Sequence, residues 1–554
     1  MDIQRYALIG AIAVLSWMLL TEWVVFKNEL TAETNTVQTQ MFSAPVTNES
    51  DTSDLPSIST DTKPEHIAAT SKMSNTDAVR VMTDTLDVLI DLRGGDIIGA
   101  GLVKYLAKLD NPNQPFVLLE KNAGREYVAQ SGLIGPDGID TKERAQFVSQ
   151  QSRYTLTDQD ETLSVKLVHE STSGLSVVKE YIFSRGSHLI ELSYHVTNTS
   201  TENKTVYLFG QLKRDGSADP SKDSSGMGLA PFLGAATSLP DKRFAKFRFQ
   251  DIEEEPLKAQ IEGSWIAMIQ HYFLSAWIPN PDQMHTYSTR ARDGFYIAGF
   301  VSPGTTIAPG ATSTTSAKLY TGPKDQYTLE KISPYLDLSV DYGWLWWVAQ
   351  PLFWLLTKIH ALVGNWGFAI ILLTVTIKAL FFKLSATSYK SMANMRRVQP
   401  KMADIREQYA DDKQKQSQAM MELYKKEKIN PMGGCLPILV QMPVFIALYW
   451  VLMESVELRH APFILWIHDL SVMDPYFVLP VIMGASMWFM QKLNPPPPDP
   501  MQAKLMQWLP IVFTFFFLWF PAGLVLYWVI NNLLSMTQQY VITKQIENAP
   551  HPVR

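Results

Sequence analysis

One lysine lies inside a very apolar stretch of the chain, where a charge is costly. Lys378 belongs to the run WGFAIILLTVTIKALFFKL, and its ammonium group should avoid hydrocarbon and face protein or water. There it could attract a negatively charged or polar ligand. Thr374 and Ser385 would lie on the same helix face. The alternative is structural, because Lys378 is near Lys383 and the end of the run, so its ammonium could simply reach lipid headgroups.

Two other apolar segments carry polar side chains. Gln441 lies in the run PILVQMPVF. A second segment has a polar stripe at i, i+4, i+7 and i+11, with Asn531 beside it, formed by Trp528, Asn532, Ser535 and Gln539. A single amide in a membrane helix usually only bonds a neighbouring helix. Three polar helix faces together favour a shared hydrated cavity. We therefore predict a substrate groove lined by Lys378, Thr374, Gln441, Trp528, Asn532 and Ser535.

Motifs of enzymes and metal sites are missing from the sequence. It has no glycine-rich phosphate loop, no H-x-x-x-H pair and no G-x-S-x-G elbow. The single cysteine, Cys435, excludes an intramolecular disulfide and a cysteine-based metal cluster. A net charge of -6 argues against general binding to DNA or other nucleic acids. We predict a protein that is not an enzyme and that needs no cofactor or metal.

Apolar runs of membrane-spanning character must position the groove residues. The first, Tyr6–Phe26, has the length of a spanning helix and is predicted to be an uncleaved anchor. A cleaved signal peptide is the rival interpretation, but no small-residue cleavage site follows. Two of the other runs have only 15 residues, which predicts local thinning of the bilayer. These other runs are Val363–Phe382, Leu436–Met453, Tyr476–Met490, Met506–Phe520 and Gly523–Tyr540.

A basic segment between the second and third runs sets the orientation. Residues 385–430 carry ten Lys and Arg against six Asp and Glu, which predicts a cytoplasmic location. Asp411 and Asp412 mark a turn between two amphipathic helices, and the first of these has an apolar seam of Met395, Val398, Met402, Ile405 and Tyr409. The seam could serve only to pack the hairpin on itself. A basic face suited to ribosomal RNA or a targeting factor is formed by Arg396, Arg397 and Lys401.

The region before residue 336 has a different character. It is polar and rich in Thr and Ser at first, and then contains short β-branched runs such as LDVLIDL and LSVVKEYIF, which predict a β sandwich. The anchor and the five core runs make six spans. With the basic segment in the cytoplasm, this even number returns the C-terminus to the cytoplasm and places the β domain outside. The predicted parts are an anchor (1–27), a disordered linker (28–77), a β domain (78–335), an interfacial amphipathic helix (336–360), a five-helix core (361–545, including the hairpin 385–430) and a cytoplasmic C-terminal tail (546–554).

Long motifs resemble one family along almost the whole chain. The runs PMGGCLPILVQMPVFIALYWVLMESVELRHAPFILWIHDLS and DPMQAKLMQWLPIVFTFFFLWFPAGLVLYW, with RGGD, WIAMIQHYFLSAWIP and VDYGWLWW, are similar to the YidC/Oxa/Alb family of membrane protein insertases in its Gram-negative form. The resemblance implies a bacterial inner-membrane protein with six transmembrane helices, a periplasmic all-β supersandwich domain and a cytoplasmic helical hairpin. Both termini would be cytoplasmic.

The resemblance also implies a function. Members insert and fold nascent membrane proteins, alone or with the Sec translocon, and receive them from the ribosome and targeting factors. Their groove carries a basic residue, commonly Arg, at the position of Lys378, and Lys lacks the bidentate pairing of Arg. An apolar client helix would slide into the phospholipid bilayer along Phe445 and Phe516.

The sequence also suggests two other classes of function. A secondary transporter would use Lys378 as a counter-charge, but internal repeats and paired broken helices are not found in the sequence. A periplasmic sugar-binding or glycan-modifying enzyme with a membrane anchor would explain the β domain but leave the five apolar runs of the core without a role.

Overall fold

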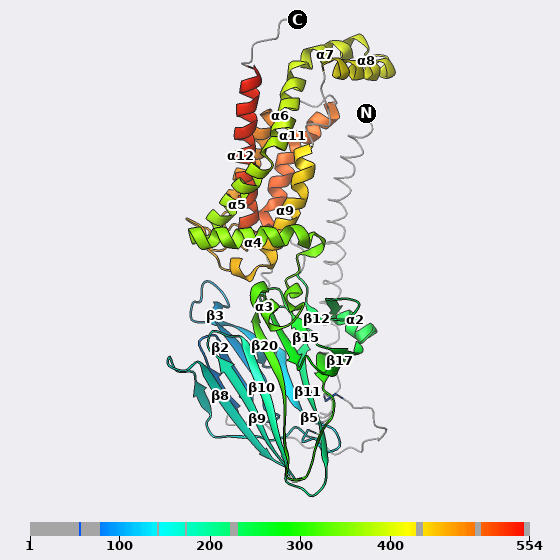
Figure 1. Ribbon diagram of the computed structural model, residues 1–554. Helices are drawn as coiled ribbons and strands as arrows, with labels where there is room; N and C mark the ends of the chain where they lie inside the picture. The colour runs from blue at the N-terminus through cyan, green and yellow to red at the C-terminus, as the bar shows by residue number, and fades with distance from the viewer. Residues whose placement is uncertain are drawn as a thin grey trace, which may run out of the picture.

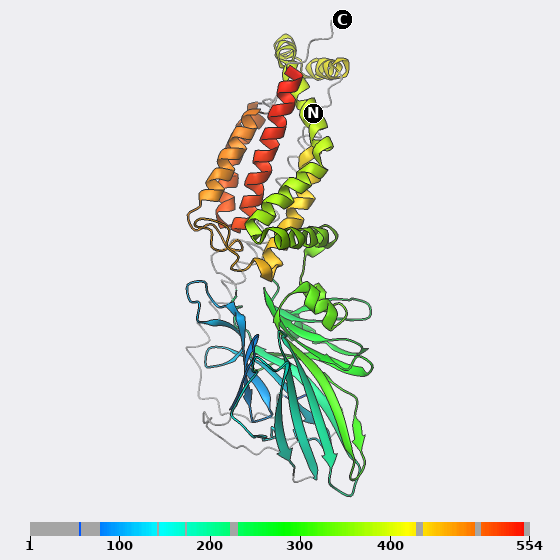
Figure 2. The ribbon, with the colours of Figure 1, turned by 60° about the vertical axis from the view of Figure 1, so that its left-hand side comes forward.

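The computed structural model describes residues 55–56, 78–140, 143–171, 174–221, 231–427, 436–493 and 500–547. The predictions for the anchor (1–27), for nearly all of the linker (28–77) and for most of the C-terminal tail lie outside these residues. The described chain consists of a β domain and a helical bundle that are stacked end to end, with the hairpin of α7 (Gln399–Gln408) and α8 (Lys413–Lys426) at the far end of the bundle (Figures 1 and 2).

The β domain consists of two sheets. The larger has 11 strands, ordered β14-β17-β18-β11-β5-β4-β3-β2-β1-β7, with β19 beside β11. Its strands are β1 (Ala78–Met82), β2 (Leu86–Asp91), β3 (Asp96–Leu106), β4 (Pro115–Lys121), β5 (Glu126–Ile134), β7 (Arg153–Thr155), β11 (Lys204–Asp215), β14 (Lys258–Glu262), β17 (Met284–Arg292), β18 (Phe295–Val301) and β19 (Thr305–Ile307).

The smaller sheet has 9 strands, ordered β13-β12-β15-β16-β20-β10-β9-β8-β6. They are β6 (Val148–Ser149), β8 (Thr162–Glu170), β9 (Leu175–Ser184), β10 (Leu189–Asn198), β12 (Gly234–Thr237), β13 (Ala245–Arg248), β15 (Ile266–Ile269), β16 (Phe273–Pro279) and β20 (Thr312–Pro323). Helix α2 (Phe249–Glu254) follows β13, and α3 (Gln326–Ile332) follows β20.

Alternating side chains explain why these segments form strands. Along β9 every second side chain is buried against the larger sheet, as expected for a strand with one face in a core. The strand predictions from the β-branched runs are confirmed, since LDVLIDL forms β2 and LSVVKEYIF forms β9. The β-rich domain is therefore present.

The RGGD motif has a structural role inside the β domain. Gly94 has φ +79°, and a side chain there would collide with the guanidinium of Arg144. That guanidinium forms a buried ion pair with Asp96. Lys179, on the opposite sheet, donates from Nζ to the carbonyl of Gly94 at 2.9 Å. The motif thus lets the chain pass close to two buried cations that join the sheets.

Lys179 should make the stability of the β domain depend on pH. It is fully buried, and burial lowers its pKa from 10.5 to about 7. Between pH of about 7 and 10.5 the unfolded chain therefore binds more protons than the folded chain. The free energy of unfolding should rise with pH in this window, by up to about 1.4 kcal/mol per pH unit. Urea unfolding of the purified chain, followed by β-sheet circular dichroism, measures this slope. In Lys179→Met the slope should flatten, and an unchanged slope would contradict this assignment.

The described part of the chain after the β domain is helical. Its helices are η2 (Leu336–Ser339), η3 (Gly343–Leu345), α4 (Trp346–Val363), α5 (Trp366–Leu380), α6 (Phe382–Arg397), α7, α8, α9 (Leu436–Glu454), η5 (Val456–Leu458), α10 (Val478–Leu493), α11 (Pro500–Phe516), η6 (Phe517–Trp519) and α12 (Ala522–Glu547). Helix α4 lies across the end of the bundle that faces the β domain (Figure 1). The bundle core is formed mainly by α4, α5, α9, α10 and α12.

All five predicted core runs are helical, but their lengths differ from the predictions. The second run does not continue straight to Phe382, because α5 ends at Leu380 and α6 leaves at a bend of 68°. Among the described residues, only this bent pair combines the length and the apolar composition of a membrane span, and no unbroken helix does so.

The predicted interfacial helix begins later than expected. Residues 336–345 form two short 3-10 turns instead of the first part of the helix, and α4 begins at Trp346. Gly343 explains the break, since its φ of +63° is incompatible with a right-handed helix and its amide bonds the Asp341 carboxylate. Around the start of α4 and along it, the exposed side chains include Trp344, Trp346, Trp347 and Trp354.

The basic segment forms helices with one unpredicted break. Asp412 caps α8 and marks the turn, as predicted. The apolar seam is interrupted at Val398, where α6 gives way to α7, because Pro400 lies in the first turn of α7. Val398 and Met402 pack against Leu423 of α8, so the seam does pack the hairpin on itself.

A buried polar joint links the β domain to the C-terminal end of α9. Lys324 and Glu454 form an ion pair of 2.6 Å, and their side chains are only 3% and 6% exposed. His271 donates from Nε2 to the carbonyl of Met453 at 2.8 Å. Arg459 donates to the carbonyl of Ala107 at 3.2 Å. These bonds attach both sheets of the β domain to the same end of the bundle.

Helices α10 and α11 approach closely at a glycine. A side chain on Gly484 would collide with the hydroxyl of Thr514. Gly484→Leu should therefore separate the two helices and cost about 1–3 kcal/mol of stability. Ala485→Leu is the matched control, because Ala485 is exposed on the same helix. Thermal unfolding of the purified chain in one detergent measures both. Equal losses from the two variants would disprove the close crossing.

Candidate functional site

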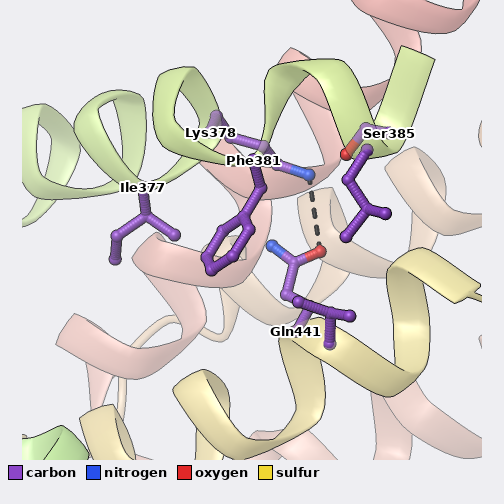
Figure 3. Close-up of a pocket in the computed structure, with 7 residues that line it drawn as sticks. Ile377, Lys378, Phe381, Ser385 and Gln441 are labelled. Atoms are coloured by element: carbon purple, nitrogen blue, oxygen red, sulfur yellow. Dashed lines mark hydrogen bonds between the residues drawn. The ribbon is translucent and has the colours of Figure 1, made fainter. Parts of the chain in front are cut away.

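A recess opens where α5 bends into α6 and faces α9. Figure 3 shows the side chains that line it, which are Ile377, Lys378, Phe381, Leu384, Ser385, Val440 and Gln441. One wall spans the break between the two helices, with Lys378 on α5 and Ser385 on α6. The opposite wall is the part of α9 that carries Gln441. The recess is thus built from the two segments whose polar residues the sequence singled out.

Lys378 points into the bundle. Its Nζ donates to Oγ of Ser535 on α12 at 2.7 Å and to Oε1 of Gln441 on α9 at 3.4 Å (Figure 3 shows the second bond). The side chain is half-buried. Both acceptors are neutral, and among the described residues no carboxylate forms an ion pair with Lys378. Its positive charge is therefore held by hydrogen bonds without being cancelled.

The polar contacts continue beyond Lys378. Gln441 donates from Nε2 to Oδ1 of Asn531, and Ser535 donates from Oγ to the Asn531 carbonyl at 2.7 Å. A connected network therefore joins α5, α9 and α12. Such a network holds the lysine in place and replaces the hydration that the apolar bundle cannot supply.

Three predicted groove residues lie elsewhere, namely Thr374, Asn532 and Trp528, the last of which belongs to an aromatic cluster. Thr374 is buried, and its hydroxyl donates to the carbonyl of Ile370 in its own helix at 2.7 Å. Asn532 is buried against α10, where its amide donates to Oγ of Ser486 at 2.9 Å. None of the three side chains lines the recess. The structure thus places Lys378, Gln441 and Ser535 together, and the other three apart from them.

Asn531 is the network residue that the sequence did not select. The polar stripe was drawn through Asn532, but Asn531 is four residues before Ser535 and so lies one helical turn from it. That spacing was a usable signal. The two neighbouring asparagines serve different helices, since Asn531 faces α9 and Asn532 faces α10.

Trp528 belongs to an aromatic cluster. Its ring meets Phe445 edge to face at 4.5 Å and lies 5.2 Å from Phe517. Phe516 contacts Phe517 and Phe520 in the same cluster. Phe445 and Phe516 are both half-buried. The predicted apolar slide therefore lies on one aromatic surface formed by α9, α11 and α12.

The three basic residues that were predicted to dock a ribosome or targeting factor are exposed near the hairpin. Arg396 and Arg397 end α6, and Lys401 lies in α7, where it forms an ion pair of 2.6 Å with Glu427. Among the described residues, no group of three or more His, Cys, Asp or Glu side chains is arranged to hold a metal ion.

Two family descriptions match consecutive parts of the chain. The description "YidC periplasmic domain" matches residues 78–355, and "60Kd inner membrane protein" matches residues 358–549. The boundary between them falls within α4.

Relatives match over their full length. The chain is 51% identical to a protein of Marinomonas sp. (strain MWYL1) over 99% of this chain and 100% of the relative. It is 49% identical to one of Stutzerimonas stutzeri (strain A1501) over 100% of both. Both relatives are named membrane protein insertase YidC. A crystal structure of an active YidC insertase with its first transmembrane domain resolved aligns over 84% of this chain and 93% of its own, at 17% identity and a TM-score of 0.38.

Proposed function

The chain belongs to the YidC family of membrane protein insertases, and from this premise we propose that it inserts nascent proteins into the inner membrane through the recess around Lys378. The observation that carries the proposal is the placement of this lysine. Its ammonium lies inside the bundle with neutral hydrogen-bond partners, beside an opening. The relatives give no support to the alternative of a secondary transporter.

The polar part of a client is expected to enter first. A carboxylate of its outer segment would replace Gln441 as a partner of Lys378, because a hydrogen bond between ionised groups is about twice as strong as a neutral one. The bond to Gln441 is the longer of the two at 3.4 Å, so it is the easier one to exchange. Charge attraction then holds the segment partway across the membrane.

The apolar part of the client leaves along a different surface. The aromatic cluster around Phe445 and Phe516 provides a hydrophobic path beside the recess. Hydrophobic burial draws the client helix into lipid, and the membrane potential pulls an acidic tail outward. No step consumes a nucleotide. The same surface would suit helices released by the Sec translocon, which makes a chaperone role part of the proposal.

The proposed topology has six spans, with both termini and the hairpin in the cytoplasm and the β domain in the periplasm. The basic hairpin and the β domain lie at opposite ends of the bundle, which supports opposite sides of the membrane (Figure 1). Arg396, Arg397 and Lys401 would then face the ribosome or a targeting factor.

Reconstitution tests the proposed function. The purified chain in liposomes, given a short two-span client released from ribosomes, should protect the client from added protease without nucleotide. Empty liposomes provide the baseline. A photo-crosslinking residue in place of Leu384, which lines the recess, should capture the client, and one in place of exposed Val148 in the β domain should not. Equal protection in empty liposomes, or equal capture at both positions, would refute the proposal.

A further inference from the structure

The segment between α9 and α10, residues 455–477, is strained at three bulky positions. We call it the outer loop. Among the described residues only five that are not glycine have a positive φ, and three of them are His460 (60°), Leu465 (57°) and Phe477 (56°). This conformation brings the Cβ atom too close to the carbonyl oxygen, so it persists only where the surrounding structure enforces it.

The outer loop also exposes apolar side chains, at and beside the strained positions. Leu465 is 75% exposed, Tyr476 69%, Ile464 45% and Phe477 38%. In water, this loop would combine unfavourable backbone geometry with exposed hydrophobic side chains. Both are unexpected unless the exposed side chains have an apolar environment.

A buried carboxylate holds part of the outer loop in this shape. Asp474 is 1% exposed and accepts bonds from the indole of Trp466 at 3.0 Å, from the amide of Tyr476 at 3.0 Å and from the amide of Leu479 at 2.7 Å. The apolar side chains are therefore displayed by a tied framework. They do not project from a loose segment.

The position of the outer loop matches that of α4. Figure 2 shows the loop and α4 at the same end of the bundle, the end that faces the β domain, and Asn365, just after α4, donates to the carbonyls of Pro462 and Phe463 in the loop, both at 3.2 Å. Trp346 and Trp347 of α4 are 57% and 62% exposed. Tryptophan and tyrosine prefer the boundary between headgroups and acyl chains.

The apolar surface of the outer loop also continues into the bundle. Val481 is 59% exposed and follows Phe477 by four residues, so it lies one turn further along the side of α10. Exposed apolar side chains on the outside of a membrane bundle face lipid. The loop surface and this helix face form one continuous strip, which favours lipid over a protein partner.

We propose that the outer loop is a second interfacial anchor, whose Leu465 and Tyr476 side chains lie in the outer leaflet at the boundary between headgroups and acyl chains. Together with α4, it holds the bundle at a set depth in the bilayer. The proposal rests on the topology given under Proposed function. Its partner is the lipid surface itself.

Spin labels measure the depth directly. With Cys435→Ser removing the only cysteine, Leu465→Cys and Tyr476→Cys would each be labelled in the full chain, with one chain per lipid nanodisc. Trp347→Cys on α4 is the reference for lipid, and Val148→Cys, 68% exposed in the β domain, is the reference for water. The labels at 465 and 476 should favour collisions with oxygen over a water-soluble nickel chelate, as at 347, by several-fold relative to 148.

Each result separates the possibilities. Water-like collisions at 465 with lipid-like collisions at 347 overturn the second anchor and leave the topology standing. Water-like collisions at both positions overturn the topology as well. A label shielded from both reagents indicates burial against protein and also overturns the anchor. In Leu465→Asp, the ratio of nickel to oxygen collisions for the label at 476 should rise at least twofold. In Leu465→Ala this ratio should rise less.

Discussion

Replacing Lys378 by glutamate is expected to reduce insertion of a client with an acidic outer segment by at least about tenfold. Two unit charges about 4 Å apart interact with about 4 kcal/mol at an effective dielectric constant of about 20. Reversing the sign replaces this attraction by repulsion, and about 1.4 kcal/mol already changes a rate tenfold. The expected loss is set at tenfold, well below what about 4 kcal/mol would give, because water in the recess screens the two charges. Protease protection in proteoliposomes, followed over time, measures the rate.

Matched variants separate charge from structure. Lys383→Glu makes the same charge change five residues away, at an exposed position, and should leave the rate close to that of the original chain. Lys378→Arg keeps the charge and should retain most of the activity. A client with a basic outer segment should be inserted better by Lys378→Glu than by the original chain. Equal losses from the changes at 378 and 383 would argue against an electrostatic role of the recess.

Breaking the ion pair of the joint is expected to have the largest effect on stability. Lys324 and Glu454 are almost completely buried, so Lys324→Met leaves a carboxylate without its partner inside the protein. Loss of one member of a buried pair costs about 3–5 kcal/mol. Native-state hydrogen exchange at the amides of His271 and Ser455, on the two sides of the joint, should show this loss as faster opening.

An exposed pair of the same length is the control. Lys401 and Glu427 are also 2.6 Å apart, but their side chains are 60% and 30% exposed. Lys401→Met should cost only about 0–1 kcal/mol. The double variant Lys324→Met with Glu454→Leu should recover much of the loss, because no charge is left buried. If the single change at 324 costs no more than the change at 401, the joint does not hold the β domain on the bundle.

Local patterns were enough to predict the two-part organisation. Alternation in runs such as LSVVKEYIF depends only on neighbouring residues, and it correctly predicted β2 and β9. The turn at Asp412 was predictable for the same reason, since a capping side chain acts on amides two and three residues away. The break at Val398 also has a local cause, because Pro400 lies in the first turn of α7.

The site was only half predictable. A lysine in an apolar run must find polar partners, so Lys378 and the approximate set of helices followed from the cost of an unpaired charge. Which amide meets it did not follow. The choice between Asn531 and Asn532 depends on how α12 is rotated about its axis. A rotation by the angle between two successive residues would turn Asn532 toward α9 in place of Asn531.

Composition and periodicity thus establish a β domain, an apolar helical bundle and a cation within that bundle, because each depends on interactions within a few residues or on the cost of burying a charge. The joint of Lys324 with Glu454, the network through Asn531 and the strained display of Leu465 could be found only in the folded chain. Residues 324 and 454 are 130 positions apart, and a contact between them arises from the stacking of whole domains, which no local pattern encodes.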